Sequence, residues 1–249
     1  MRALHLIYLF LLFASCKKTN RDLTKITAKT IAIDSTIQSS VKIDSIIAPY
    51  KEKLINEMEK VLSYTPKDLT KISIEMQSTL GNLMADMCFK MANPMFKENT
   101  KASIDFAMFN YGGLRAIIPA GKVTKEHAFK LMPFENELVV VNITGDKVAE
   151  LVNYFIKNKE AHPLSKNIAL IIIKENNYAL KINNKEFDNN KTYNVLTSDF
   201  LQSGGDKMNF FKNPKKLTKL NYKVRDAIIS YLEKVDTLKT TIDKRVTIK

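Results

Sequence analysis

Two Gly-Gly pairs in the sequence each stand next to a charged residue at the end of an apolar run. Gly112-Gly113 in AMFNYGGLR comes just before Arg115, and Gly204-Gly205 in TSDFLQSGGD comes directly before Asp206. The chain has only 7 glycines, and glycine lets a backbone turn tightly or approach a ligand closely. A guanidinium at such a turn can offer two parallel N–H groups to a phosphate or carboxylate. An ordinary surface ion pair of Arg115 would explain these residues equally well.

Two phenylalanines stand on expected turns beside polar side chains. Phe134 in LMPFENE is followed by Asn136, and Phe200 in SDFLQSGGD shares its segment with Asp206. Two aromatic faces can sandwich a flat heterocycle, and stacking on a base is worth roughly 1–3 kcal/mol. An amide can both donate to and accept from a base edge, and a carboxylate can accept from ribose hydroxyls. Because a single phenylalanine is more often part of a core, the prediction of a nucleoside pocket depends on their joint placement.

The motifs of several common hydrolase classes are absent from the sequence. It contains no GxxxxGK[ST] phosphate loop, no GxSxG nucleophile turn and no HExxH helix. Beyond the N-terminal apolar segment the histidines are His127 and His162, which stand far apart. A dinuclear phosphatase site needs several His and Asp ligands to hold two cations about 3.5–4 Å apart. We therefore predict no catalytic residue, metal ligand or cofactor in this chain itself.

Apolar periodicity predicts strands mixed with helices. Helical spacing of apolar residues predicts helices from Asp44 to Leu62, over 79–91, and starting near Thr124, Asp146 and Arg225. Short runs of β-branched and aromatic residues predict strands at ISIEM, IDFAMF, ELVVVNI, IALIIIK, YALKI and TYNVLTS. This mixture predicts a layered mixed α/β domain.

The first residues have the features of an export signal. Residues 1–16 combine a basic start, a short apolar run and small residues before Cys16. The segment FASC resembles the lipobox of bacterial lipoproteins, in which the cysteine receives the lipid. We predict a signal peptide over 1–16, a flexible tether over 17–43 and one domain over 44–249. The expected location is the bacterial cell envelope, with a lipid anchor on the periplasmic or surface face. Ordinary cleavage to a soluble product is the alternative.

The net charge of +13 raises the question of a nucleic-acid partner. Only 5 of the 39 basic residues are arginine, and the lysines are scattered along the chain. A solvated lysine-rich surface is the better interpretation, so we predict no nucleic-acid partner.

Several segments together resemble the C-terminal domain of the bacterial 5′-nucleotidase and UDP-sugar hydrolase family. NYGGLR, IPAGKVT, LMPFENELVVVNITG and TYNVLTSDFLQSGGD are similar to family segments of the types NGGGIR, IPAG, PFGN and NDFLA with GGDGY. LGNLMADM is similar to LGNLIADA, and the order and spacing agree over about 44–249. The resemblance implies a nucleotide pocket edged by the two glycine pairs. In it Phe134 and Phe200 would stack on the base, Asn136 would meet the base edge, Asp206 the ribose and Arg115 the phosphate.

Three positions depart from the family pattern. Tyr111 replaces the second glycine of NGGGIR, and Glu135 replaces the glycine of PFGN. The segment before LGNL carries only Lys71 where the family has one or two arginines. Because this segment lacks those arginines, we expect weaker phosphate binding. From Glu135 we expect repulsion of phosphorylated ligands or an altered base preference.

The largest departure concerns the catalytic half. Family enzymes carry an N-terminal metallophosphatase domain with two metal ions, and in this chain we predict a signal and tether in its place. The resemblance implies a nucleotide-recognition domain that acts with a separate metallophosphatase chain in nucleotide catabolism, with the divalent metal pair held by that partner. Two alternatives stay open: a stand-alone nucleoside-binding lipoprotein, and a degenerate structural or interaction module without a ligand. Whether the chain hydrolyses a phosphate monoester by itself also stays open.

Overall fold

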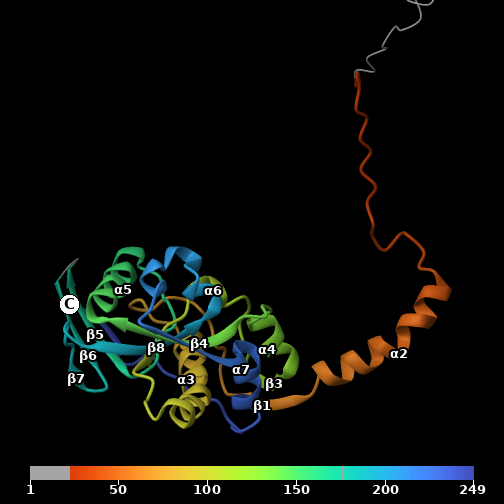
Figure 1. Cartoon of the computed structure of the whole chain (residues 1–249). Coiled ribbons are helices and arrows are strands. Elements are labelled where there is room, and N and C mark those ends of the chain that lie inside the picture. The colour runs from red at the N-terminus through yellow and green to blue at the C-terminus, as the bar shows by residue number, and fades with distance from the viewer. Residues whose placement is uncertain (1–22, 175–176) are drawn as a thin grey trace, which may run out of the picture. The chain divides into compact units, whose positions relative to one another are not determined.

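The computed structural model describes residues 23–174 and 177–249 (Figure 1). The predicted signal peptide and its Cys16 lie outside the described residues. The chain divides into two units, Met1–Ala48 and Pro49–Lys249. Residues 23–40 form no helix or strand, and helix α2 (Val41–Met58) then continues across the division between the units. In the described part of the chain, no helix combines the length and the apolar character needed to cross a membrane.

Helix α2 differs from its prediction at both ends and in its packing. It begins at Val41 rather than Asp44 and ends at Met58, and none of its residues is buried. Val61 and Leu62, expected on its apolar face, belong to strand β1 (Val61–Thr65). That strand pairs antiparallel with β3 (Gly121–Thr124). Tertiary pairing therefore prevails here over the helical spacing of the apolar residues.

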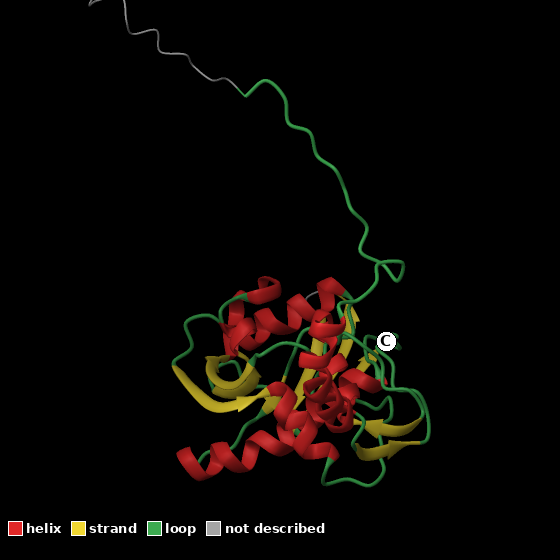
Figure 2. Cartoon of the chain, turned by 90° about the vertical axis from the view of Figure 1, so that its right-hand side faces the viewer, coloured by secondary structure: helices red, strands yellow, loops and turns green. Residues whose placement is uncertain are grey.

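The main sheet has the strand order β2-β8-β4-β9. Its strands are β2 (Phe106–Ala107), β8 (Thr192–Ser198), β4 (Glu137–Thr144) and β9 (Lys216–Lys223). Strand β2 runs parallel to β8, while β4 is antiparallel to both β8 and β9. Residues 138–141 of β4 are all buried. Because neighbouring strand residues point to opposite faces, both faces of this sheet are covered, as the helices around it in Figure 2 illustrate.

A second sheet has the order β10-β5-β6-β7. It is built from β5 (Ile168–Lys174), β6 (Asn177–Ile182), β7 (Lys185–Glu186) and β10 (Val246–Ile248). Strands β5, β6 and β7 form an antiparallel meander, and the C-terminal β10 runs parallel to β5.

Besides α2, five α-helices and three short 3₁₀ helices accompany these strands in the described chain. Helix α3 (Thr79–Thr100) contacts β2 and β9, and α5 (Gly145–Asn158) contacts β4 and β8. The other α-helices are α4 (Lys125–Leu131), α6 (Asp199–Gln202) and α7 (Val224–Leu232), and the 3₁₀ helices are η2 (Tyr111–Gly113), η3 (Gly205–Lys207) and η4 (Asn209–Phe211). Figure 1 shows helices packed against the sheets, and the predicted layered mixed α/β class is confirmed.

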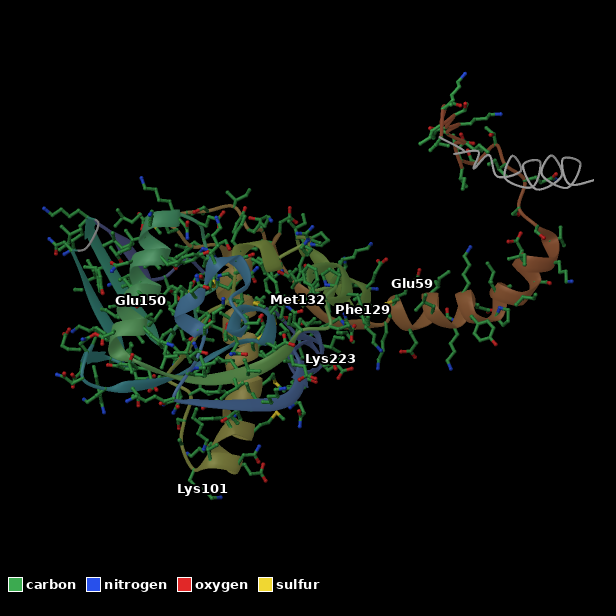
Figure 3. The ribbon with its side chains drawn as sticks, turned by 45° about the horizontal axis from the view of Figure 1, so that its top comes forward. Glu59, Lys101, Phe129, Met132, Glu150 and Lys223 are labelled. Atoms are coloured by element: carbon green, nitrogen blue, oxygen red, sulfur yellow. The ribbon has the colours of Figure 1, made fainter. Side chains whose placement is uncertain are left out.

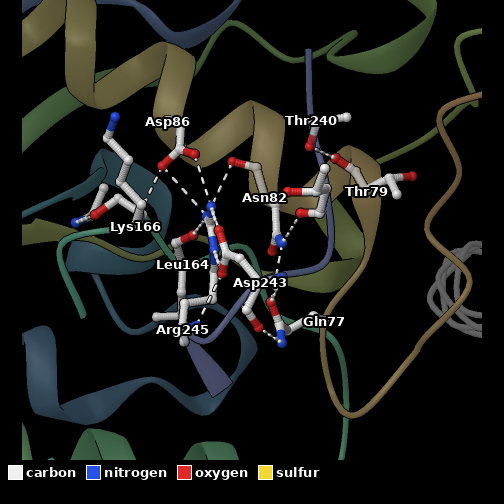
Figure 4. Close-up of polar contacts among 12 residues, drawn as sticks. Gln77, Thr79, Asn82, Asp86, Leu164, Lys166, Thr240, Asp243 and Arg245 are labelled. Atoms are coloured by element: carbon white, nitrogen blue, oxygen red, sulfur yellow. Dashed lines mark hydrogen bonds and ion pairs between the residues drawn. The ribbon is translucent and has the colours of Figure 1, made fainter. Parts of the chain in front are cut away.

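A buried arginine joins the C-terminal segment to α3 (Figure 4). The Arg245 side chain is 4% exposed and pairs with Asp86 at 2.9 Å and with Asp243 at 2.7 Å. Its Nη1 also donates to the Leu164 carbonyl at 2.5 Å. Nearby, Gln77 Nε2 donates to the Val246 carbonyl at 2.8 Å. These contacts hold β10 in place beside β5.

Most predicted elements agree with the structure, but the strand predicted at IDFAMF is reduced to the two residues of β2, Phe106–Ala107. Strands β4, β5, β6 and β8 match their predicted segments, and α4, α5 and α7 start within a residue or so of the predicted positions. The predicted strand ISIEM is wrong, because Glu75 and Met76 take φ values of 50° and 60° that turn the chain. Lysine-rich β9 has no apolar run and was not predicted. Helix α3 continues to Thr100 through Pro94, well beyond the predicted residue 91.

Candidate functional site

The topology of the main sheet brings the predicted site segments to one edge. In the antiparallel pair β4 and β8, Leu138 lies opposite Ser198. The loop before β4, with Phe134, therefore meets the turn after β8, with Phe200. Strand β2 runs parallel to β8, so the loop that follows β2 leaves at the same edge. Strand β9 ends beside the start of β4, which adds the beginning of α7.

A pocket of about 270 Å³ lies at this edge. It is close to the lower end of the range for small-ligand pockets, which is roughly 300–1,000 Å³. The structure brings together seven of the residues predicted from the sequence: Gly112, Gly113, Arg115, Phe134, Asn136, Phe200 and Asp206. The sequence analysis missed five other lining residues: Phe109, Asn110, Met132, Ser198 and Val224.

The two predicted stacking residues are exposed, as a pocket wall requires. Phe134 is 39% exposed and Phe200 is 44% exposed, so neither ring belongs to the core. The Arg115 guanidinium lies 5.9 Å from the centre of the Phe134 ring. Phe134 comes from the loop before β4 and Phe200 from α6, and both rings line the same pocket.

Gly204 and Gly205 do not line the pocket but support its wall. Gly204 takes a φ of 95°, in the left-handed region that favours glycine. A Cβ on Gly205 would lie 2.4 Å from the Phe200 Cε1 atom. The Phe200 ring therefore lies directly against the backbone at Gly205, a contact that any side chain there would prevent. The glycine at position 205 is therefore required for the position of the Phe200 ring.

Asp206 is exposed and takes a φ of 51°. Its Oδ2 accepts a hydrogen bond from Asn110 Nδ2 at 2.6 Å, and its carbonyl accepts one from the Tyr154 hydroxyl at 2.8 Å. Asn110 thus links the two glycine-containing loops. It opens the segment NYGGLR, and a polar residue next to the glycine pair was the sequence signal that could have identified it.

Two cations, Arg115 and Lys71, lie beside the first glycine loop. Arg115 is exposed, and its guanidinium contacts the Gly112 carbonyl at 3.4 Å and the Phe134 ring rather than a carboxylate. The Lys71 Nζ donates to the Leu114 carbonyl at 3.2 Å and lies 4.4 Å from the centre of the Tyr111 ring. The remaining N–H groups of Arg115 are therefore available for an anion, and Lys71 lies beside the same loop.

His162 supports the first glycine loop from beneath. It is 4% exposed, and its Nδ1 accepts a hydrogen bond from the Tyr111 N–H at 3.0 Å. Its Nε2 lies 3.5 Å from Glu160 Oε2 but makes no hydrogen bond. Burial lowers the pKa of His162 to about 4, so the ring is neutral near pH 7.

His127 stabilises the start of helix α4. Its Nδ1 accepts from the Thr124 N–H at 2.9 Å and so completes the N-terminal cap of α4. Among the described residues, no group of three or more His, Cys, Asp or Glu side chains is arranged to hold a metal ion. What the pocket offers chemically is recognition: two aromatic faces, an amide, a carboxylate and a guanidinium.

The sequence is similar to a known domain family. Residues 65–213 match the sequence profile of the family described as "5'-nucleotidase, C-terminal domain". The chain is 23% identical to the protein UshA of Escherichia coli over 205 residues, which cover 80% of this chain and 35% of that protein. It is 33% identical to UshA of Yersinia enterocolitica over 109 residues, covering 43% of this chain and 20% of the relative.

Solved structures give the same result for the fold. The 5'-nucleotidase precursor of Thermus thermophilus superposes with a TM-score of 0.66 at 19% identity, covering 82% of this chain and 42% of that one. A putative 5'-nucleotidase of Staphylococcus aureus superposes with a TM-score of 0.62 at 15% identity, covering 87% and 45%. The chain spans less than half the length of each of these four proteins.

Proposed function

Because the chain belongs to the 5′-nucleotidase C-terminal domain family, we propose that its pocket binds a nucleoside or nucleotide between Phe134 and Phe200. The base would stack between the rings, with the Asn136 amide at its edge. The ribose would lie beside Asp206 and the phosphate beside Arg115. The observation that carries this proposal is that both exposed rings and these three polar side chains line one pocket.

The proposed biological role is recognition for a phosphatase reaction in nucleotide catabolism. The described residues provide no group suited to a metal pair, so we propose that a separate metallophosphatase chain holds the divalent cations. This partner would act on a nucleotide whose base is held in the pocket. Loss of nucleotidase activity on deletion of this chain, with recovery of a phosphatase in a pull-down, is the expected result. Retained activity together with an empty pull-down would refute the partnership.

A second function is favoured by a separate observation. All pocket residues come from 109–224, within the unit Pro49–Lys249, so one unit of this chain supplies both rings and all three polar side chains. This supports a stand-alone nucleoside-binding protein of the cell envelope. We further propose a lipid anchor at Cys16, which mass spectrometry of the membrane fraction would test.

Calorimetric titration of the purified protein with adenosine, AMP and a UDP-sugar tests the pocket directly. We expect binding in the micromolar range that Phe134→Ala and Phe200→Ala each weaken strongly. A metal-dependent hydrolysis assay on the same sample separates recognition from catalysis. Absence of binding by all three ligands, or unchanged affinity in both variants, would refute the proposed pocket.

A further inference from the structure

The turn that carries Phe134 and Asn136 connects α4 to β4, and its middle residue is Glu135. The Glu135 side chain is 64% exposed and does not line the pocket. Glu135 and its neighbours contact the end of β9 and the start of α7 instead. Phe129, Met132 and Lys223, labelled in Figure 3, mark this region.

Glu135 is paired with two cations at once. One carboxylate oxygen, Oε1, accepts from Arg225 Nη2, and the other, Oε2, accepts from Lys223 Nζ. We call these three residues the Glu135 clamp. Both ion pairs lower the pKa of Glu135 to about 2, so the carboxylate is charged throughout the physiological range.

Arg225 extends the clamp to the backbone of the turn. Its Nη1 lies 3.3 Å from the Phe134 carbonyl and 3.4 Å from the Met132 carbonyl, and it donates to both. One residue earlier, the Val224 N–H donates to the Asn136 carbonyl at 2.9 Å. The backbone on both sides of Glu135 is therefore held by consecutive residues of α7.

The balance of charge makes Glu135 essential to this arrangement. The Arg225 side chain is only 8% exposed, its buried Nε has no hydrogen-bond partner, and its guanidinium lies 4.3 Å from the centre of the Phe129 ring. A buried guanidinium without its carboxylate is strongly unfavourable. If Glu135 lost its charge, Arg225 and Lys223 would be left as two neighbouring cations, and Arg225 would move toward solvent.

We propose that Glu135 is a positioning residue that, through the Glu135 clamp, holds the Phe134 ring and the Asn136 amide where a base can be stacked and recognised. This inference rests on the proposed nucleoside-binding function. It differs from the expectation that Glu135 repels phosphorylated ligands. Both of its oxygens are occupied by cations, and the clamp as a whole keeps a positive charge.

The test compares Glu135→Gln with the wild-type protein, using adenosine, AMP and ribose 5-phosphate as probes. We expect adenosine and AMP to bind about 10-fold more weakly, because a displaced ring loses part of the stacking interaction. Binding of ribose 5-phosphate, which has no base, should stay unchanged. Glu126→Gln is the matched control, because it removes the same charge from an exposed ion pair with Lys130 on α4, and it should leave all three affinities unchanged.

Hydrogen exchange supplies a measurement that does not depend on a ligand. In Glu135→Gln the Val224 amide and the segment 130–137 should exchange faster than in the wild-type protein and in Glu126→Gln. Unchanged exchange and unchanged affinities would overturn the clamp, and tighter AMP binding would overturn it in favour of repulsion. If the wild-type protein binds none of the probes, the proposed function fails, and the exchange rates still decide whether Glu135 positions the turn.

Discussion

Replacing Gly205 by alanine should weaken nucleoside binding without seriously damaging the fold. Among the described glycines only Gly121 and Gly204 have positive φ, so the backbone at Gly205 suits alanine. The obstacle is the Phe200 ring. The new Cβ would lie 2.4 Å from Cε1, 2.5 Å from Cζ and 2.7 Å from Cδ1.

The size of the effect follows from these distances. Two carbon atoms are comfortable at about 3.5–4.0 Å, so the ring must move by roughly 1 Å or more. Phe200 is 44% exposed and has room to rotate outward, so the stability should fall by only about 1 kcal/mol. The base would lose much of a stacking interaction worth roughly 1–3 kcal/mol, which corresponds to about 5- to 100-fold in affinity.

A double-mutant cycle measured by calorimetry with adenosine tests this mechanism. If Gly205→Ala acts by displacing the Phe200 ring, it should cost less than about 2-fold in a Phe200→Ala background. Gly121→Ala is the control, because Gly121 has a φ of 111° and nothing within 4 Å of an added Cβ. It should lower stability by about 1 kcal/mol and leave affinity unchanged. Equal losses from Gly205→Ala in both backgrounds would refute the reasoning.

Three further substitutions probe the surrounding structure. Gly145→Ala should lower the free energy of unfolding, measured in urea, by about 3 kcal/mol. Its Cβ would lie 2.3 Å from the Asn189 carbonyl oxygen, which belongs to the backbone and cannot rotate away. A loss below about 1 kcal/mol would contradict this contact. Arg245→Met should lower the free energy of unfolding by roughly 2–4 kcal/mol. The loss is somewhat smaller than for a fully buried ion pair, because the Asp86 and Asp243 side chains are 28% and 36% exposed. An unchanged melting temperature would contradict this prediction. His162 has a pKa of about 4 in the folded protein and about 6.5 in the unfolded chain. Its contribution to the free energy of unfolding is therefore complete above pH 6.5. As the pH falls from about 6.5 to about 4, the free energy of unfolding should decrease by up to roughly 3 kcal/mol. His162→Asn keeps an acceptor for the Tyr111 N–H and should remove this part of the pH dependence; an identical pH dependence in both proteins would argue against it.

Much of the fold could be predicted because the buried strands carry their own pattern. ELVVVNI and IALIIIK are runs of β-branched residues, and the structure places both as strands with the predicted bounds or one residue more. Strand β9, KLTKLNYK, was not predictable in this way, because it lies at an edge of the sheet and only Leu220 among its residues is buried. Its existence depends on pairing with β4, which no local pattern encodes.

The lining of the candidate pocket could be predicted as a set of side chains but not as a set of contacts. Phe134, Asn136, Phe200, Asp206 and Arg115 were identified from their types and turn positions, and all line one pocket. The support behind them could not be foreseen. The Asn110–Asp206 bond spans 96 positions and the Glu135–Arg225 pair spans 90. Only the register of the main sheet brings such distant residues together.

The departures from the family pattern provide an argument against a degenerate site. A site without a ligand would have no need to keep its charged residues paired. In this chain each departing residue has a partner next to the pocket. Tyr111 packs against the Lys71 ammonium at 4.4 Å, and Glu135 pairs with Arg225 and Lys223. Substitutions compensated in this way keep the rings exposed and Arg115 available, as the proposed nucleoside-binding function requires.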